Sequence, residues 1–203
     1  MGFRNSDREW GSFSKLLHWT IALLIIGSSI FVLHVNDSTW WFKSTPLIFI
    51  QYINVHKTFG LLALLLILIR IWWRTRERVP VTDALTPFEQ KWSHRTHVAL
   101  YVLMVAVPLT GWISSSLFGS PTKVFGWFTI PPITPKYKPA LPLAYWTHFT
   151  LAWMILTLAA FHAGAALYHH FVRKDRVLKA MLPGRSRSDE SDGAVADAGL
   201  TTR

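Results

Sequence analysis

Cysteine is absent from the 203 residues, and charged residues make up only 16% of them. Without cysteine, the chain forms no disulfide, thiolate metal site, cysteine-held iron–sulfur cluster or haem attached through C-x-x-C-H. A metal must therefore be bound by histidine, carboxylate or methionine. The opening residues "MGFRNSDREWGSFSK" also lack a small-residue cleavage signature before the first apolar segment, which we interpret as an uncleaved span.

Apolar residues are abundant, at 51% of the chain, with 11 Trp and 13 Phe. This exceeds what the core of one small domain hides and is typical of a lipid-facing protein. The net charge of +10 raises the alternative of a nucleic-acid binder. The basic residues fall between and beyond apolar blocks and form no stripe, so we predict the lipid bilayer as partner and no nucleic acid.

Four apolar segments approach the roughly 20 residues needed to cross hydrocarbon. They lie at about 16–33, 52–73, 96–116 and 145–171. Only helices satisfy their own backbone in lipid at this length, so we predict an all-α, integral membrane four-helix bundle. Pro108 and Gly111 lie inside the third segment and are expected to bend it.

Lys and Arg residues predict the orientation. The N-terminal segment, the second connection and the tail carry three, six and seven of them, sixteen in all, against five on the other side. Both termini are therefore predicted to be cytoplasmic. The connection 117–144, rich in proline and aromatic residues, is predicted to fold as an outer cap, residues 1–183 to form the domain, and the polar tail 184–203 to be disordered.

Histidine is the abundant titratable residue inside the spans, and an ionisable residue there is a functional hypothesis by default. His148 and His162 are fourteen residues apart, which places them on nearly one helix face with a rise of about 21 Å between them. With alternating helix directions, His18 and His162 lie near the inner side, and His56 and His148 near the outer side. Depth thus permits the pairs His18–His162 and His56–His148.

Two facing imidazoles at equal depth suit a metal in the middle of a bundle. A bare zinc ion would need four ligands, whereas a haem needs only two axial ones. Two stacked b-type haems are therefore the economical hypothesis. Gly60, one turn after His56, and Gly164 beside His162 would allow a porphyrin close to the backbone, although they serve helix packing equally well.

The other histidines are weaker candidates. His97, which shares a face with His94, is a geometric rival to His18 or His162 as an inner ligand. His169 lies two turns beyond His162 on the same face, where it would hydrogen-bond a quinone carbonyl or simply be solvated. His34 and His170 are expected to be interfacial.

Several stretches resemble the bacterial cytochrome b561 family over roughly residues 13–183. They are "SKLLHWTIALL", "INVHKTFGLLALLLILIRIWWR", "HVALYVLMVAVPLTGW", "VFGWFTIP" and "WTHFTLAWMILTLAAFHAGAALYHHFVRKDRVLKAMLP". The resemblance implies a four-helix di-haem cytochrome of the bacterial inner membrane. It implies axial ligands at His18, His56, His148 and His162, paired as depth requires.

The resemblance also implies an activity. Some members resemble superoxide oxidases, which pass electrons from superoxide outside through both haems to ubiquinone, and His169 matches a residue associated with the quinone site. Related cytochromes instead serve as membrane subunits of hydrogenases or of other redox partners. A structural or transport bundle without cofactor is the third hypothesis.

Cationic side chains complete the expectations. Lys57, Lys136 and Lys138 would attract an anionic donor or simply be solvated. The residues nearest in sequence for haem propionates are Lys15 and Arg95 at the inner end and Asn54 and Lys57 at the outer end. Arg70 and Arg74 would serve the same purpose or only obey the positive-inside bias.

Overall fold

The computed structural model describes residues 2–7, 9–37, 46–80, 85–125 and 127–183, with side chains not described at 35–37 and 46–51. Four long helices dominate it: α1 (Ser12–Asp37), α3 (Pro46–Arg76), α4 (Pro87–Phe118) and α5 (Leu141–Tyr168). All four are long and apolar enough to cross a membrane. The predicted all-α, four-helix membrane fold is confirmed, whereas the tail 184–203 lies outside the described residues.

Helix α4 is longer than the predicted span 96–116, because a capping box starts it earlier. The Thr86 side chain accepts a hydrogen bond from the Glu89 amide, and the Glu89 carboxylate accepts one from the Thr86 amide. Pro87 occupies the first turn, where its missing N–H costs nothing. The helix ends at Gly119, whose φ of 82° gives a left-handed cap.

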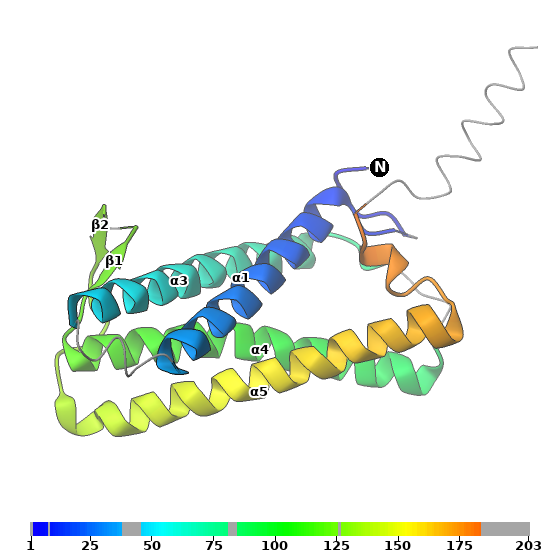
Figure 1. Ribbon diagram of the computed structural model, residues 1–203. Helices are drawn as coiled ribbons and strands as arrows, with labels where there is room; N and C mark the ends of the chain where they lie inside the picture. Colours follow the sequence, from blue (N-terminus) through cyan, green and yellow to red (C-terminus); the bar gives the residue numbers. More distant parts are fainter. Residues whose placement is uncertain (1, 8, 38–45, 81–84, 126, 184–203) are drawn as a thin grey trace, which may run out of the picture.

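Helix packing divides the bundle into two pairs. α1 packs on α3, α4 packs on α5, and α3 joins the pairs through α4 (Figure 1). The most deeply buried apolar cluster lies between α1 and α3 and contains Leu17, Ile21, Leu64 and Ile67. Among the described residues, the backbone of α5 packs closely on α4 and makes little or no such contact with α1 or α3.

One end of the bundle, called here the hairpin end, carries two short antiparallel strands, β1 (Thr122–Val124) and β2 (Phe128–Ile130), and the short helix η1 (Lys138–Ala140) (Figure 1). β1 packs on α3, and Trp112 of α4 donates to the Pro131 carbonyl at 3.3 Å. The prediction that 117–144 folds as a cap is thus confirmed.

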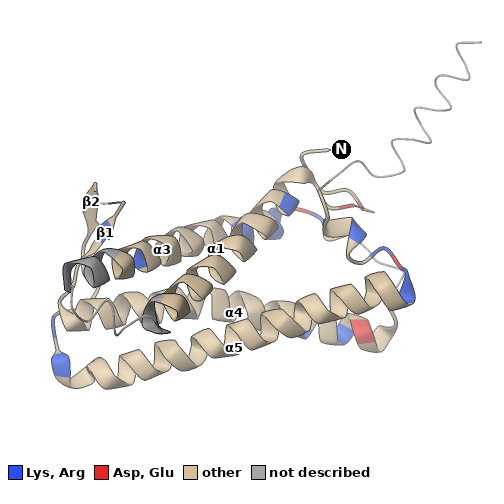
Figure 2. Cartoon of the chain, viewed as in Figure 1, with Lys and Arg blue, Asp and Glu red and all other residues tan. Residues whose placement is uncertain are grey.

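The opposite end, called here the N-terminal end, carries residues 2–7 and 9–11, the π-helix η2 (His169–Arg173) and the short helix η3 (Lys179–Met181). In Figure 2 the ribbon positions of charged residues lie mostly toward the two ends of the bundle, and those of acidic residues lie at the N-terminal end. Every acidic residue whose side chain is described lies there, namely Asp7, Glu9, Glu77, Glu89 and Asp175. The lysines of the hairpin end therefore face no described carboxylate.

Candidate haem-binding site

The structure brings His56 of α3 and His148 of α5 together near the hairpin end. Their ring centroids are 6.2 Å apart and their planes make an angle of 74°. The two helices do not pack closely along their backbones, so the imidazoles meet from helices that stand apart. This arrangement leaves each ring facing the other across the interior of the bundle.

A second pair has the same geometry near the N-terminal end. The rings of His18 on α1 and His162 on α5 are 6.3 Å apart at an angle of 70°. Here too the backbones of the two helices make little or no close contact. The rings therefore meet in both of the pairs that the predicted depths of the histidines permitted.

The separation within each pair fits one metal ion bound by two imidazoles on opposite sides. A metal–imidazole bond of about 2.0 to 2.1 Å, plus about 1.2 Å from the bound nitrogen to the ring centre, puts the centroids about 6.4 to 6.6 Å apart. The separations of 6.2 and 6.3 Å are close to this value. Within the described part of the chain, no three His, Asp or Glu residues gather as a bare metal site would require. Two ligands per site fit a haem, whose porphyrin supplies the other four.

His97 of α4, the rival inner ligand, lies beside the second pair. Its ring centroid is 5.2 Å from that of His162, with an angle of 72° between the planes. This is about 1 Å too short for two imidazoles on opposite sides of one ion. His97 contacts Ser93 of its own helix, at 3.4 Å from Nδ1 to the hydroxyl. The spacing favours His18 over His97 as the partner of His162.

Both histidines near the hairpin end have a hydrogen-bond partner, and for His148 this partner fixes the tautomer. His148 Nδ1 is 2.9 Å from the Val107 carbonyl, which only accepts, so Nδ1 carries the proton and Nε2 keeps the lone pair that a metal needs. His56 Nδ1 lies 2.8 Å from the hydroxyl of Ser28, which is buried in α1. Both rings thus have a hydrogen-bond partner on another helix.

Gly111 was expected only to bend α4, and the structure gives it a second role. A Cβ at this position would lie 2.9 Å from Cε1 of His148, so the glycine makes room for the ring. Cβ atoms at Gly60 and Gly164 would meet nothing within 4 Å. These two glycines are therefore not required for helix packing, and a flat group can approach them.

The remaining histidines divide into exposed and buried ones. His34 and His94 are exposed, which agrees with an interfacial place. His169 is only 8% exposed, and its Nδ1 is 2.5 Å from Asp175 Oδ2. Nδ1 of His170 is buried without a hydrogen-bond partner in the described structure. Asp175 was not singled out in the sequence, because it lies beyond the apolar span.

The basic side chains lie in different environments. Lys57 bonds to the carbonyl and hydroxyl of Ser120 at 3.3 and 2.9 Å, whereas Lys136 and Lys138 are exposed. Arg70 donates to the Ser14 carbonyl at 3.1 Å and is near enough to interact electrostatically with His18 and His162. Arg70 is therefore placed for an anionic group at the second site.

Arg95 was the other inner residue expected to bind an anionic group, and its side chain instead contacts Trp92. Its guanidinium lies 5.3 Å from the centre of the Trp92 ring and is exposed. Lys15 is buried, with 6% of its surface exposed, next to the N-terminal segment. Asn54 Oδ1 is buried without a partner in the described structure, near the first pair. This oxygen is an acceptor, so it suits a donor group of a bound molecule and not an anionic one.

These features define a helical membrane protein in which two pairs of imidazoles face one another, one pair near each end of the bundle. The model of the family described as prokaryotic cytochrome b561 matches residues 9–184, and the chain belongs to this family. It is a membrane cytochrome, and membership implies that it binds b-type haem.

Named relatives agree with this assignment. The chain is similar to cytochrome b561 homolog 2 of Escherichia coli strain K12, with 31% identity over 193 residues that cover 93% of this chain and 98% of the relative. It is 29% identical to cytochrome b561 homolog 1 of the same strain, over 85% of this chain and 98% of that protein. It is also 28% identical to a probable superoxide oxidase CybB of Yersinia pestis, over 82% and 92% of the two chains.

Proposed function

We propose that the chain binds two haem b groups and carries electrons across the bacterial inner membrane, from superoxide outside to ubiquinone inside. The observation that carries the proposal is the presence of two imidazole pairs with centroids 6.2 and 6.3 Å apart. His56 and His148 would hold the outer haem, and His18 and His162 the inner one. In this orientation the hairpin end is outside and both termini of the domain 1–183 are cytoplasmic, as the distribution of Lys and Arg predicts.

Haem b supplies one-electron redox chemistry when it is bound. Two histidines would hold each haem, and a haem held in this way would favour electron transfer over the binding of oxygen to its iron. The balanced reaction is two superoxide anions, one ubiquinone and two protons giving two molecules of oxygen and one ubiquinol. His169, at the inner end of α5, would hydrogen-bond the quinone.

Superoxide as donor is supported by charge at the hairpin end. Lys57, Lys123, Lys136 and Lys138 lie there, and no acidic residue whose side chain is described does. A cationic surface on which no carboxylate is described raises the encounter rate of a small anion. The relative named as a probable superoxide oxidase supports the same donor.

A second candidate is a cytochrome subunit that passes electrons between a protein partner, such as a hydrogenase or another periplasmic redox protein, and the quinone pool. The aromatic residues of the cap favour it, since Phe125, Trp127 and Tyr137 are 60, 87 and 59% exposed. Exposed aromatic side chains are common anchors of protein interfaces.

Purified protein tests the proposal. We expect two haems per chain with b-type absorption, and one haem after replacement of both His56 and His148 by Ala. Replacement of both His56 and His162 should remove both haems, and loss of only one would refute the pairing. Superoxide should reduce the haems at a rate that falls as salt rises. A slow, salt-independent reduction, together with a partner that co-purifies, would favour the subunit instead.

A further inference from the structure

The backbone after α5 folds back so that Asp175 meets His169. In the π-helix η2, the His169 carbonyl accepts hydrogen bonds from the amide of Lys174 and, at 3.1 Å, from that of Asp175. Lys174 adopts a left-handed conformation with φ of 56°, which is uncommon for a residue other than glycine. π-turns and such backbone outliers occur often at functional sites. The turn places two ionisable side chains against each other.

The contact between the two side chains is short and sheltered. His169 Nδ1 is 2.5 Å from Asp175 Oδ2, and the side chains are 10 and 15% exposed. A carboxylate only accepts, so Nδ1 carries the proton. Nε2 makes no hydrogen bond to any residue in the described part of the chain, which leaves it available to another molecule.

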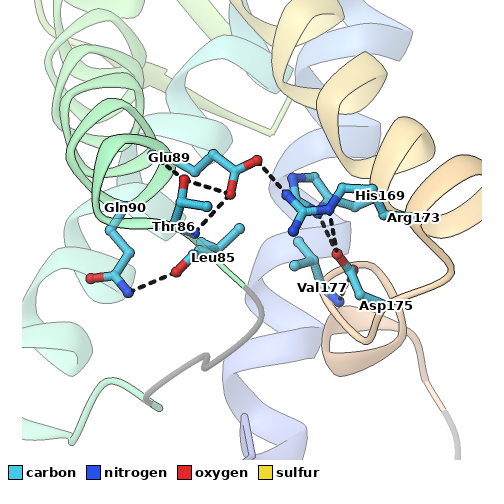
Figure 3. Close-up of polar contacts among 8 residues, drawn as sticks. All are labelled: Leu85, Thr86, Glu89, Gln90, His169, Arg173, Asp175 and Val177. Carbon is cyan, nitrogen blue, oxygen red and sulfur yellow. Dashed lines mark hydrogen bonds and ion pairs between the residues drawn. The ribbon is translucent and has the colours of Figure 1, made fainter.

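Other residues hold Asp175 in this position (Figure 3). The Val177 amide donates to Oδ1 at 3.1 Å, and Arg173 Nε is 3.9 Å from Oδ2. Arg173 also pairs with Glu89 of α4, which ties the turn to the capping box. Burial would raise the pKa of Asp175, but the hydrogen bonds from His169 and Val177 and the charge of Arg173 outweigh it and lower that pKa. Asp175 therefore stays a carboxylate.

The pair lies next to the inner haem site. His169 is seven residues beyond His162, about 10 Å along the helix and on nearly the same face. Further along the chain, the Met181 carbonyl accepts a hydrogen bond of 2.8 Å from Trp19, the neighbour of His18. The segment that carries Asp175 is thus anchored at both helices that supply inner ligands.

We propose that Asp175 is a positioning residue for quinone reduction, which holds His169 so that Nε2 donates a proton to a quinone carbonyl oxygen. The inference rests on the proposed function. The quinone gains two electrons through the cytochrome and two protons. For one of these protons, Nε2 first takes a proton from cytoplasmic water while Nδ1 keeps its own; the Nε2–H bond then breaks and a quinone O–H bond forms. Asp175 accepts from Nδ1–H throughout and keeps the ring in one orientation, as carboxylates do for catalytic histidines.

The test uses Asp175→Asn, with Asp175→Glu as the conservative variant and Asp7→Asn as the matched control. The control removes an exposed carboxylate that pairs with Arg78 and leaves the contact between His169 and Asp175. Reduced, haem-loaded protein is mixed with ubiquinone-1, and reoxidation of the haems is followed. We expect Asp175→Asn to lower kcat about 10- to 100-fold with little change in KM. Asp175→Glu should recover part of the loss, and Asp7→Asn should behave as the wild type.

A double-mutant cycle separates positioning from a structural effect. If Asp175 acts through His169, Asp175→Asn adds little to the loss already caused by His169→Gln. Nitrogen NMR of histidine-labelled, reduced protein gives a readout independent of turnover. The His169 Nδ1 signal is the one missing in His169→Gln, and Asp175→Asn should change it. An unchanged kcat, full additivity or an unchanged signal would overturn the inference.

Failure of the proposed function gives a different result. If ubiquinone does not reoxidise the wild-type haems, the acceptor is wrong, whatever the variants do. If the wild type reacts and Asp175→Asn reacts equally fast, only the role of Asp175 is wrong. If Asp175→Asn loses haem, Asp175→Glu is compared with the wild type instead. Wild-type turnover in Asp175→Glu, together with a shifted His169 NMR signal, would also contradict positioning by Asp175.

Discussion

Gly111 of α4 leaves room for the ring of His148 on α5, because a Cβ at position 111 would lie 2.9 Å from Cε1 and 3.1 Å from Nδ1 of that ring. The same ring reaches the Val107 carbonyl one turn earlier on α4, at 2.9 Å. Helix α4 thus supplies no ligand to the first pair and still determines where its imidazole points. Replacement of a group that orients a metal-binding histidine typically lowers metal affinity or activity about 10- to 100-fold.

Gly111→Ala should therefore weaken the binding of the haem proposed at His56 and His148. The added methyl displaces the ring, with an overpacking cost of about 1 to 3 kcal/mol. We expect a preparation with close to one haem per chain, measured by haem extraction and absorption. Gly27→Ala is the control, since a Cβ there would meet nothing within 4 Å. Two full haems in Gly111→Ala would show that the His148 ring is not a ligand in this position.

Ser28→Ala should weaken the same site through its other histidine, His56. The hydroxyl lies 2.8 Å from His56 Nδ1, and without it the ring donates less electron density to a bound metal. We expect haem to leave about 10 to 100 times faster to a scavenger protein, and the midpoint potential of one haem to rise. Ser29→Ala, one residue along α1 and about 100° around it, should change neither quantity. Equal effects of both replacements would point to general loosening of α1.

The sequence was sufficient to predict the four spans and the histidine pairs, because both follow from hydrocarbon thickness and helix direction. It underestimated α4, whose first turns lie beyond the apolar stretch and are started by the Thr86–Glu89 capping box. A hydropathy pattern reports the part of a helix inside lipid and not the polar turns that continue it. The helix therefore starts at Pro87, where the apolar pattern indicated about residue 96.

The role of Asp175 was not predictable from helical periodicity. Six residues after His169, an α-helix would have turned by about 600° and placed Asp175 on a different face. The π-turn and the left-handed Lys174 bring the two side chains together instead. Contacts that depend on an irregular turn are visible only in the three-dimensional structure. The same is true of the ring-centroid distances to His162, which are 5.2 Å from His97 and 6.3 Å from His18.

His97→Ala should leave two haems in place. His97 is too close to His162 to share an ion with it from the opposite side, whereas His18 has the required spacing. We expect absorption spectra and haem content like those of the wild type, compared with loss of the inner haem in His18→Ala. The reverse result, with haem lost in His97→Ala and kept in His18→Ala, would make His97 the inner ligand.

Lys174→Gly should stabilise the turn that holds Asp175. A left-handed conformation costs an L-residue about 1 to 2 kcal/mol, and glycine avoids this cost. Part of the gain is offset, since glycine has more freedom in the unfolded chain. We expect the thermal midpoint in detergent to rise by about 2 to 4 °C for each kcal/mol gained, with stronger protection of residues 174–183 against hydrogen exchange. Arg176→Gly is the control, because Arg176 is exposed and has no positive φ, so glycine there should lower the midpoint. A lower midpoint in Lys174→Gly would mean that the lysine side chain stabilises the turn by more than its backbone conformation costs.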